Sequence, residues 1–165
     1  MSEVGLTAER LRELLWYNPE TGVFTWRVRP GRKMRIGQEA GSMTANGYVQ
    51  IKVDKRRYLA HRLAWLHVHG EWPIDDIDHI NGVRTDNRIE NLRDVTGHVN
   101  MQNLKKATAQ NKTAKMLGVT MSRDRYQAQI KVDGKYKYLG VFESAEAAHE
   151  AYLVAKRELH PGCTI

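Results

Sequence analysis

A polar stretch from Gln102 to Lys115 limits what this chain can fold into more than any other feature of its sequence. It shows no regular apolar period, so it indicates a linker or an exposed helix tail. On either side of it, short strand patterns end in turns and are followed by helical patterns. This division of a 165-residue chain favours small α+β modules. Modules below about 60 residues bury little apolar surface and would depend on each other or on a bound partner.

The first module, residues 1–44, is predicted to hold a helix, a strand and a basic loop. Thr7 can cap a helix whose apolar positions Leu11, Leu14 and Leu15 recur at helical spacing, and which ends at Tyr17 to Pro19. Residues 23–26 form a predicted strand. The loop after this strand is rich in cations, at Arg27, Arg29, Arg32, Lys33 and Arg35.

The second module, residues 45–104, is predicted to start with a hairpin over 48–53 and 57–59. A buried helix over 60–69 follows, with His61 and Arg62 expected at its surface; the alternative is that they line the cleft of the site. From Ile77 onward the pattern becomes strand, loop, strand and helix: Asn-Gly ends the first strand, residues 92–96 form the second, and Gly97 to Lys105 form the helix.

Beyond a linker over 105–116, residues 117–165 predict a three-stranded antiparallel sheet and a helix. Apolar side chains alternate with polar ones from Tyr126 to Val132, as in a strand with one face buried. Asp133-Gly134 is a strong hairpin signal, and Ser144 can cap a helix rich in alanine. Because alanine lets the helix lie close on the sheet, we expect the other, polar face of the sheet to stay open.

The charge of +7 and the sequence pI near 9.6 indicate a polyanionic partner. The charge is unevenly distributed: residues 75–100 hold six acidic and three basic side chains, between two basic flanks. We call residues 75–100 the acidic island. An acidic island suits a cation site, whereas a protein that only holds phosphates has no need of one; chance clustering of surface acids is the alternative.

Cys163 is the only cysteine, so no disulfide can form within the chain, and a reducing compartment fits. Charged residues at positions 3, 9, 10, 12 and 13 exclude the apolar core of a secretory signal, and no apolar run reaches the roughly 18 residues of a membrane span. We therefore expect a soluble cytoplasmic protein without a membrane partner.

The strand–loop–strand–helix segment carries a spaced polar set. Asp78-His79 is followed by Asn91 twelve residues after the histidine and by Asn100 nine residues later. This pattern, over roughly 45–104, resembles the HNH endonucleases with a ββα-metal core, and most of all the homing type encoded by phages and introns. The resemblance implies a nuclease that hydrolyses the phosphodiester bonds of DNA in a bacterial or phage-infected cell. It also implies that Asn91 holds the ring of His79.

The chemistry fits such a set. A neutral histidine accepts a proton from water near pH 7, and Asp78 and Asn100 offer the oxygen ligands that Mg²⁺ or Mn²⁺ prefers. One metal site per chain predicts a nick in one strand. Two alternatives stay open: His98 can replace Asn100 as the ligand on the helix, and Asn87, which we expect to brace the loop, can replace Asn91.

The C-terminal pattern resembles the AP2 domain, a three-stranded DNA-binding module found in plant transcription factors and some phage endonucleases. The resemblance implies that the open sheet face binds double-stranded DNA. Glutamine, lysine and tyrosine stand where that family often has arginine and tryptophan, so its base preference cannot be transferred. Its DNA-binding positions correspond here to Arg123, Arg125, Gln127, Gln129, Lys131, Tyr136 and Tyr138, to which the basic loop adds Arg32, Lys33 and Arg35.

Two other functions compete with a nuclease that acts on DNA as a monomer or weak dimer. One is a DNA-binding regulator in which the HNH-like segment is only a scaffold; the intact set of Asp78, His79, Asn91 and Asn100 argues against it. The other is a nuclease directed at RNA. Metal-dependent nicking of a plasmid separates the first from the nuclease, and competition between duplex DNA and structured RNA tests the second.

Overall fold

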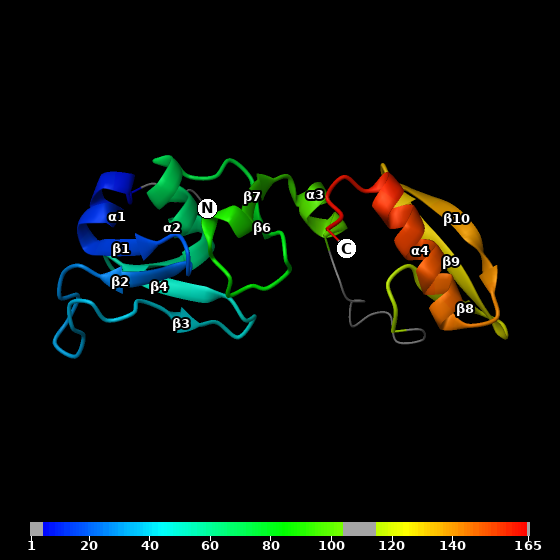
Figure 1. Cartoon of the computed structure of the whole chain (residues 1–165), viewed down its shortest axis with the longest axis horizontal. Coiled ribbons are helices and arrows are strands. Elements are labelled where there is room, and N and C mark those ends of the chain that lie inside the picture. The colour runs from blue at the N-terminus through cyan, green and yellow to red at the C-terminus, as the bar shows by residue number, and fades with distance from the viewer. Residues whose placement is uncertain (1–4, 104–114, 165) are drawn as a thin grey trace. The chain divides into compact units, whose positions relative to one another are not determined.

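The computed structural model describes residues 5–103 and 115–164 and is of mixed α/β type (Figure 1). The described residues form four α-helices and four small antiparallel sheets of two or three strands. They fall into two compact units, one up to Thr96 and one from Gly97 onward. Most of the expected linker, 105–116, and the end of the helix expected to reach Lys105 lie outside the described residues. Within the described ranges, no helix has the length and apolar character needed to cross a membrane.

The first unit opens with helix α1 (Ala8–Leu14), capped by Thr7, whose hydroxyl accepts a hydrogen bond from the Arg10 amide at 3.2 Å. The prediction that this helix continues toward Tyr17 is wrong. Leu15 adopts extended dihedral angles and starts strand β1 (Leu15–Asn18), which pairs with β2 (Val23–Trp26). Burial explains the change, because Leu15 and Tyr17 both enter the core at the two-residue spacing of a strand.

A three-stranded sheet follows, with the order β3 (Ser42–Met43), β4 (Val49–Val53) and β5 (Arg56–Leu59). The turn between β4 and β5 places Asp54 and Lys55 at positive φ angles of 45° and 70°, which suits a two-residue hairpin. Helix α2 (Ala60–His69) then runs to Gly70, as predicted, where φ of 83° ends it in a left-handed cap.

The last elements of the first unit are β6 (Asp76–His79), a short 3₁₀ turn η1 (Ile89–Asn91) and β7 (Leu92–Val95). Strands β6 and β7 pair with Asp78 opposite Arg93 and His79 opposite Leu92. One apolar cluster joins all parts of this unit, so the N-terminal residues share a core with the hairpin and helix that follow. Its most deeply buried members include Leu11, Leu15, Ile51, Leu63 and Ala64.

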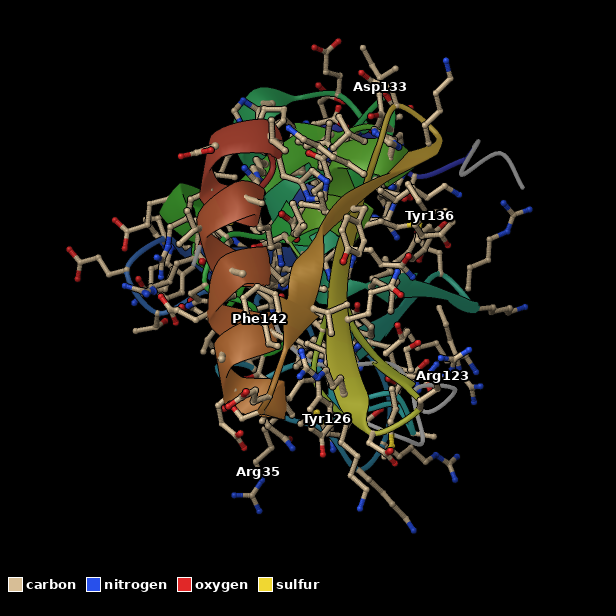
Figure 2. The ribbon with its side chains drawn as sticks, turned by 90° about the vertical axis from the view of Figure 1, so that its right-hand side faces the viewer. Arg35, Arg123, Tyr126, Asp133, Tyr136 and Phe142 are labelled. Carbon is tan, nitrogen blue, oxygen red and sulfur yellow. The ribbon has the colours of Figure 1, made fainter. Side chains whose placement is uncertain are left out.

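The second unit holds helix α3 (Gly97–Gln102), strands β8 (Val119–Ser122), β9 (Arg125–Val132) and β10 (Lys135–Phe142), and helix α4 (Ala145–Leu159). Strand β9 is central, and α4 packs on one face of the sheet. In Figure 2 Phe142 lies on the side of α4, whereas Tyr136 lies on the other side. The main chain after α4 contacts α3, since the Gly162 amide donates to Gln102 Oε1 at 3.0 Å.

Candidate active site

His79 ends strand β6 and is buried, with 5% of its surface exposed. Its Nε2 lies 3.2 Å from Oδ1 of Asn87. The Nδ2 of Asn87 donates to the carbonyl of Thr85, which leaves Oδ1 to accept from the ring. Nε2 of His79 therefore carries the proton in this contact, and Nδ1 carries the lone pair of the neutral imidazole.

Asn87 is itself held from two sides by the N-terminal hairpin. Its main-chain carbonyl accepts a hydrogen bond from the Tyr17 hydroxyl at 2.8 Å. At the turn between β1 and β2, Gly22 has φ of 72°, and a Cβ there would lie 2.5 Å from main-chain atoms of Asn87 and Arg88. Only glycine allows this approach, so the hairpin supports the residue that orients His79.

The side chain of Asn91 bonds to main-chain groups of the loop that follows β6. Its Oδ1 accepts from the Asn81 amide at 2.9 Å, and its Nδ2 donates to the carbonyl of Asp86 at 2.8 Å. Asn91 thus ties the two ends of the loop between β6 and η1, while Asn87 makes the contact with the ring of His79. The contact of Asn87 with His79 favours the alternative in which Asn87 takes the role of Asn91, and the choice between the two stays a prediction.

Two further aromatic side chains surround His79. The ring of His61, on α2, lies 5.0 Å from the His79 ring at 86°, an edge-to-face arrangement. The Tyr48 ring lies 5.3 Å from His61 and 6.0 Å from His79. His61 is only 5% exposed, so its expected place at the helix surface is wrong. Its Nδ1 is buried without a hydrogen-bond partner in the described part of the chain.

Burial keeps both imidazoles neutral. Burial lowers the pKa of His61 to about 3, with smaller contributions from His79 and Arg62. Burial also lowers the pKa of His79, and the Arg84 charge acts in the same direction, although the bond to Asn87 and the charges of Asp78 and Asp86 oppose it. At neutral pH the histidine on β6 is therefore uncharged.

Asp78 lies in the middle of the pairing between β6 and β7, with 7% of its surface exposed. Arg93 stands opposite it and donates two hydrogen bonds to the same oxygen, Oδ2, at 2.9 and 2.7 Å. The carboxylate is therefore positioned by a cation from the neighbouring strand. Strand register alone brings the two together, which is why the sequence pattern did not reveal the pair.

Most acids of the acidic island have structural partners of this kind. Arg88 bridges Asp86 and Glu90 at 2.7 Å to each, and this guanidinium lowers the pKa of Asp86 to about 2. The carboxylate of Asp94 accepts from the main-chain amides of residues 74 and 75. Most acids of the acidic island therefore stabilise the loop and the strand pair, a role that neither explanation from the sequence included.

The other predicted ligands lie on α3, which belongs to the second unit. Asn100 is half-buried there, and His98 is exposed, with its Nε2 3.2 Å from the Gln102 amide nitrogen. Asp78 and Asn100 therefore belong to different units, and their joint binding of a cation stays a prediction, as does the choice between Asn100 and His98.

The open face of the second unit's sheet carries the residues predicted to bind DNA. Alternation along β9 is confirmed: Ala128 and Ile130 are fully buried, whereas Lys131 is exposed. Lys131 pairs with Tyr136, and Gln129 with Tyr138, across the β9–β10 ladder. The two tyrosines are 69% and 60% exposed, and Lys131 Nζ lies 5.7 Å from the Tyr136 ring centre. Exposed cations lie in two further places, at Arg123 and Arg125 in the β8–β9 hairpin and at Arg32, Lys33 and Arg35 in the basic loop.

Comparison with known protein families finds a match to the segment that holds His79. Residues 58–102, from the end of β5 to the end of α3, match the HNH endonuclease family. No curated protein and no solved structure matches the chain. HNH nucleases use a divalent metal and act on DNA, and the matched segment includes Asp78, His79, Asn91 and Asn100. The chain therefore contains an HNH endonuclease domain at residues 58–102, which supports a metal-dependent nuclease.

Proposed function

We propose that this protein is a homing-type HNH endonuclease that nicks double-stranded DNA, with His79 as the general base and one divalent cation held by Asp78 and Asn100. The observation that carries the proposal is the hydrogen bond between His79 Nε2 and Asn87 Oδ1, in a site buried behind the N-terminal hairpin. A histidine that is buried, neutral and fixed in one tautomer is suited to remove a proton from water.

His79 would perform the proton transfer at Nδ1. The bond from Nε2 to Asn87 leaves the lone pair on the other nitrogen, and the ring of His61 restricts how His79 can turn. The proton of an attacking water would pass to Nδ1 while the water oxygen bonds to phosphorus. The bond from phosphorus to the leaving oxygen then breaks.

The donor atoms of Asp78 and Asn100 fit Mg²⁺ or Mn²⁺, since carboxylate and amide oxygens are the hard ligands these ions prefer. The described residues contain no group of three or more His, Cys, Asp or Glu side chains that could hold an ion. This is compatible with Mg²⁺, which keeps several waters and takes few protein ligands. A bound cation supplies charge stabilisation at the scissile phosphate and the leaving oxygen.

DNA would be held by the open face of the β8–β9–β10 sheet, as in the AP2 domain that this region resembles, and by the basic loop. Support comes from the paired Lys131 and Tyr136, which join a cation for phosphates to an exposed ring. The protein would act as a monomer or weak dimer in a bacterial or phage-infected cell.

One observation favours the alternative of a non-catalytic DNA-binding regulator. Arg93 already occupies Oδ2 of Asp78, the carboxylate proposed as a metal ligand. In a scaffold that binds no metal, the ion pair with Arg93 would be enough to neutralise the Asp78 carboxylate. In a nuclease the guanidinium has to share the carboxylate with the cation or leave it.

Nicking of supercoiled plasmid DNA tests the proposal. We expect open circles with Mg²⁺ or Mn²⁺, none with EDTA, and none from His79→Ala, while a gel-shift assay finds both proteins bound to the DNA. A parent protein that binds DNA but nicks no better than His79→Ala in either metal would establish the regulator instead. Competition with structured RNA completes the test, because preferred cleavage of RNA would overturn DNA as the substrate.

A further inference from the structure

We propose that Arg84 binds a phosphate of the DNA backbone beside His79, and that Tyr48 and Asn46 hold its guanidinium ready for it. This phosphate site rests on the proposed nuclease function, which does not itself assign Arg84 a role.

The loop and strand that follow His79 carry three arginines, Arg84, Arg88 and Arg93, and their partners differ. Arg88 contacts the carboxylates of Asp86 and Glu90, and Arg93 contacts that of Asp78. Within the described ranges, Arg84 forms no ion pair with a carboxylate; its hydrogen bond goes to the main-chain carbonyl of Asn46. Arg84 is therefore the one of the three whose positive charge is not offset by an acid.

Arg84 is exposed yet held in place by two contacts. Its Nη1 donates to the main-chain carbonyl of Asn46 at 2.7 Å, and its guanidinium carbon lies 5.0 Å from the centre of the Tyr48 ring. The Tyr48 ring lies against one face of the guanidinium, and the hydrogen bond to Asn46 uses one of its edges. A guanidinium has five N–H donors, so others are left for a phosphate. An arginine held in this way loses less side-chain freedom on binding than a solvated one.

Tyr48 also connects Arg84 to the proposed catalytic histidine. The same ring that stacks against the guanidinium lies 6.0 Å from the His79 ring. A phosphate bound by Arg84 would thus be a near neighbour of the phosphate attacked by the water that His79 deprotonates. The chemical class of the ligand follows, since a planar cation in an exposed position beside a phosphodiesterase site matches the backbone phosphates of its nucleic-acid substrate.

The test compares Arg84→Ala with Arg10→Ala. Arg10 lies on α1 and is paired with Glu13 and Asp54, so its removal changes the net charge equally without a phosphate contact. DNA affinity is measured from low to moderate salt. We expect the slope of log K against log salt to weaken by about 0.9 in Arg84→Ala and to stay unchanged in Arg10→Ala. Nicking at subsaturating DNA should fall at least about tenfold, the size of one lost charge-assisted hydrogen bond.

The variant Arg84→Lys gives a second test of the phosphate site that does not depend on removing a long side chain. It keeps the charge but not the planar fork, so we expect the parental salt slope with only partial nicking. Equal slopes in Arg84→Ala and the parent, or equal changes in Arg84→Ala and Arg10→Ala, would overturn the phosphate site. If the parent itself shows no metal-dependent nicking, the nuclease proposal fails, while the salt slope still decides whether Arg84 contacts phosphate.

Discussion

The polar side chains proposed for proton transfer in the first unit and for DNA binding on the sheet of the second unit differ in burial. In the first unit, His61, Asp78, His79, Asn87 and Asn91 are all buried next to a single large apolar cluster. In the second, two small apolar clusters lie between the sheet and α4, and the other sheet face presents its lysine and tyrosines to solvent. Burial holds a side chain in one orientation, whereas exposure leaves it free to meet a large partner.

This difference in burial matches two physical requirements, one for proton transfer and one for DNA binding. Proton transfer requires a base within hydrogen-bond reach of one water, in a known tautomer, and the contacts around His79 supply that order. Holding a long polyanion requires many separate contacts, each of modest strength. We therefore expect changes at the buried polar residues of the first unit to alter rate or stability, and changes at exposed cations or on the sheet face to alter binding.

The largest effect is expected at the proposed catalytic residues. His79→Ala and Asp78→Ala should each abolish nicking, and the loss of the general base alone is worth about 10²- to 10⁴-fold in rate. Neither residue adds positive charge, so DNA affinity should stay within a few fold of the parent in gel shifts. If both folded variants lose DNA binding along with cleavage, the division between the two units is wrong.

The next effect is on stability in acid. The pKa of His61 is lowered to about 3, against about 6.5 in an unfolded chain, so the unfolded state binds a proton first as the pH falls. The first unit should thus lose up to a few kcal/mol of stability between pH 6.5 and 3. All tryptophans lie before Thr96, so tryptophan fluorescence in urea reports this unit alone. His61→Phe keeps a ring and should lose less stability over the same pH range; an identical pH dependence would contradict this.

Substitutions at Asn87 and Asn91 should then have different effects, the first on the nicking rate and the second on stability. Asn87→Ala frees the His79 ring and should lower the nicking rate about 10- to 100-fold, as when the outer partner of a metal-bound histidine is removed. Asn91→Ala leaves an amide and a carbonyl of the loop without their partner and should cost about 1–3 kcal/mol of stability. Nicking rates and urea unfolding, measured for both variants, separate the effect on rate from the effect on stability. A loss of rate in Asn91→Ala at full stability, with none in Asn87→Ala, would support the role that the family resemblance implies for Asn91.

A smaller stability effect tests the support from the N-terminal hairpin. Gly22→Ala places a side chain at φ of 72° and against the main chain of Asn87, so we expect a loss of at least about 1 kcal/mol. Gly31→Ala is the matched control, because its added Cβ would meet nothing within 4 Å. Unfolding followed by tryptophan fluorescence should separate the two variants, and equal midpoints would show that the hairpin gives no such support.

The sequence predicted regular patterns well and contacts between distant segments poorly. Alternation from Tyr126 to Val132 and the turns at Asp54-Lys55 and Asp133-Gly134 are local, and the structure confirms all three. The adjacent Leu14 and Leu15 fit both a helix and a strand, and only packing decides between them. The partner of Asp78 lies on the neighbouring strand, and the ring beside His61 lies on β6, so no spacing along the chain could reveal them.

The smallest effects are expected on the open sheet, where each residue supplies one contact among many. Lys131→Ala should weaken the salt dependence of DNA binding by about 0.9 in slope, and Tyr138→Ala should weaken affinity several fold with no change in slope. Lys137→Ala is a matched control in charge, since Lys137 pairs with the buried Ile130 and not with the Gln127–Gln129–Lys131 row. Nicking at saturating DNA should stay parental in all three. Unchanged affinity in both Lys131→Ala and Tyr138→Ala would remove the sheet face as the DNA-binding surface, and with it the contrast between a buried catalytic unit and an exposed binding unit.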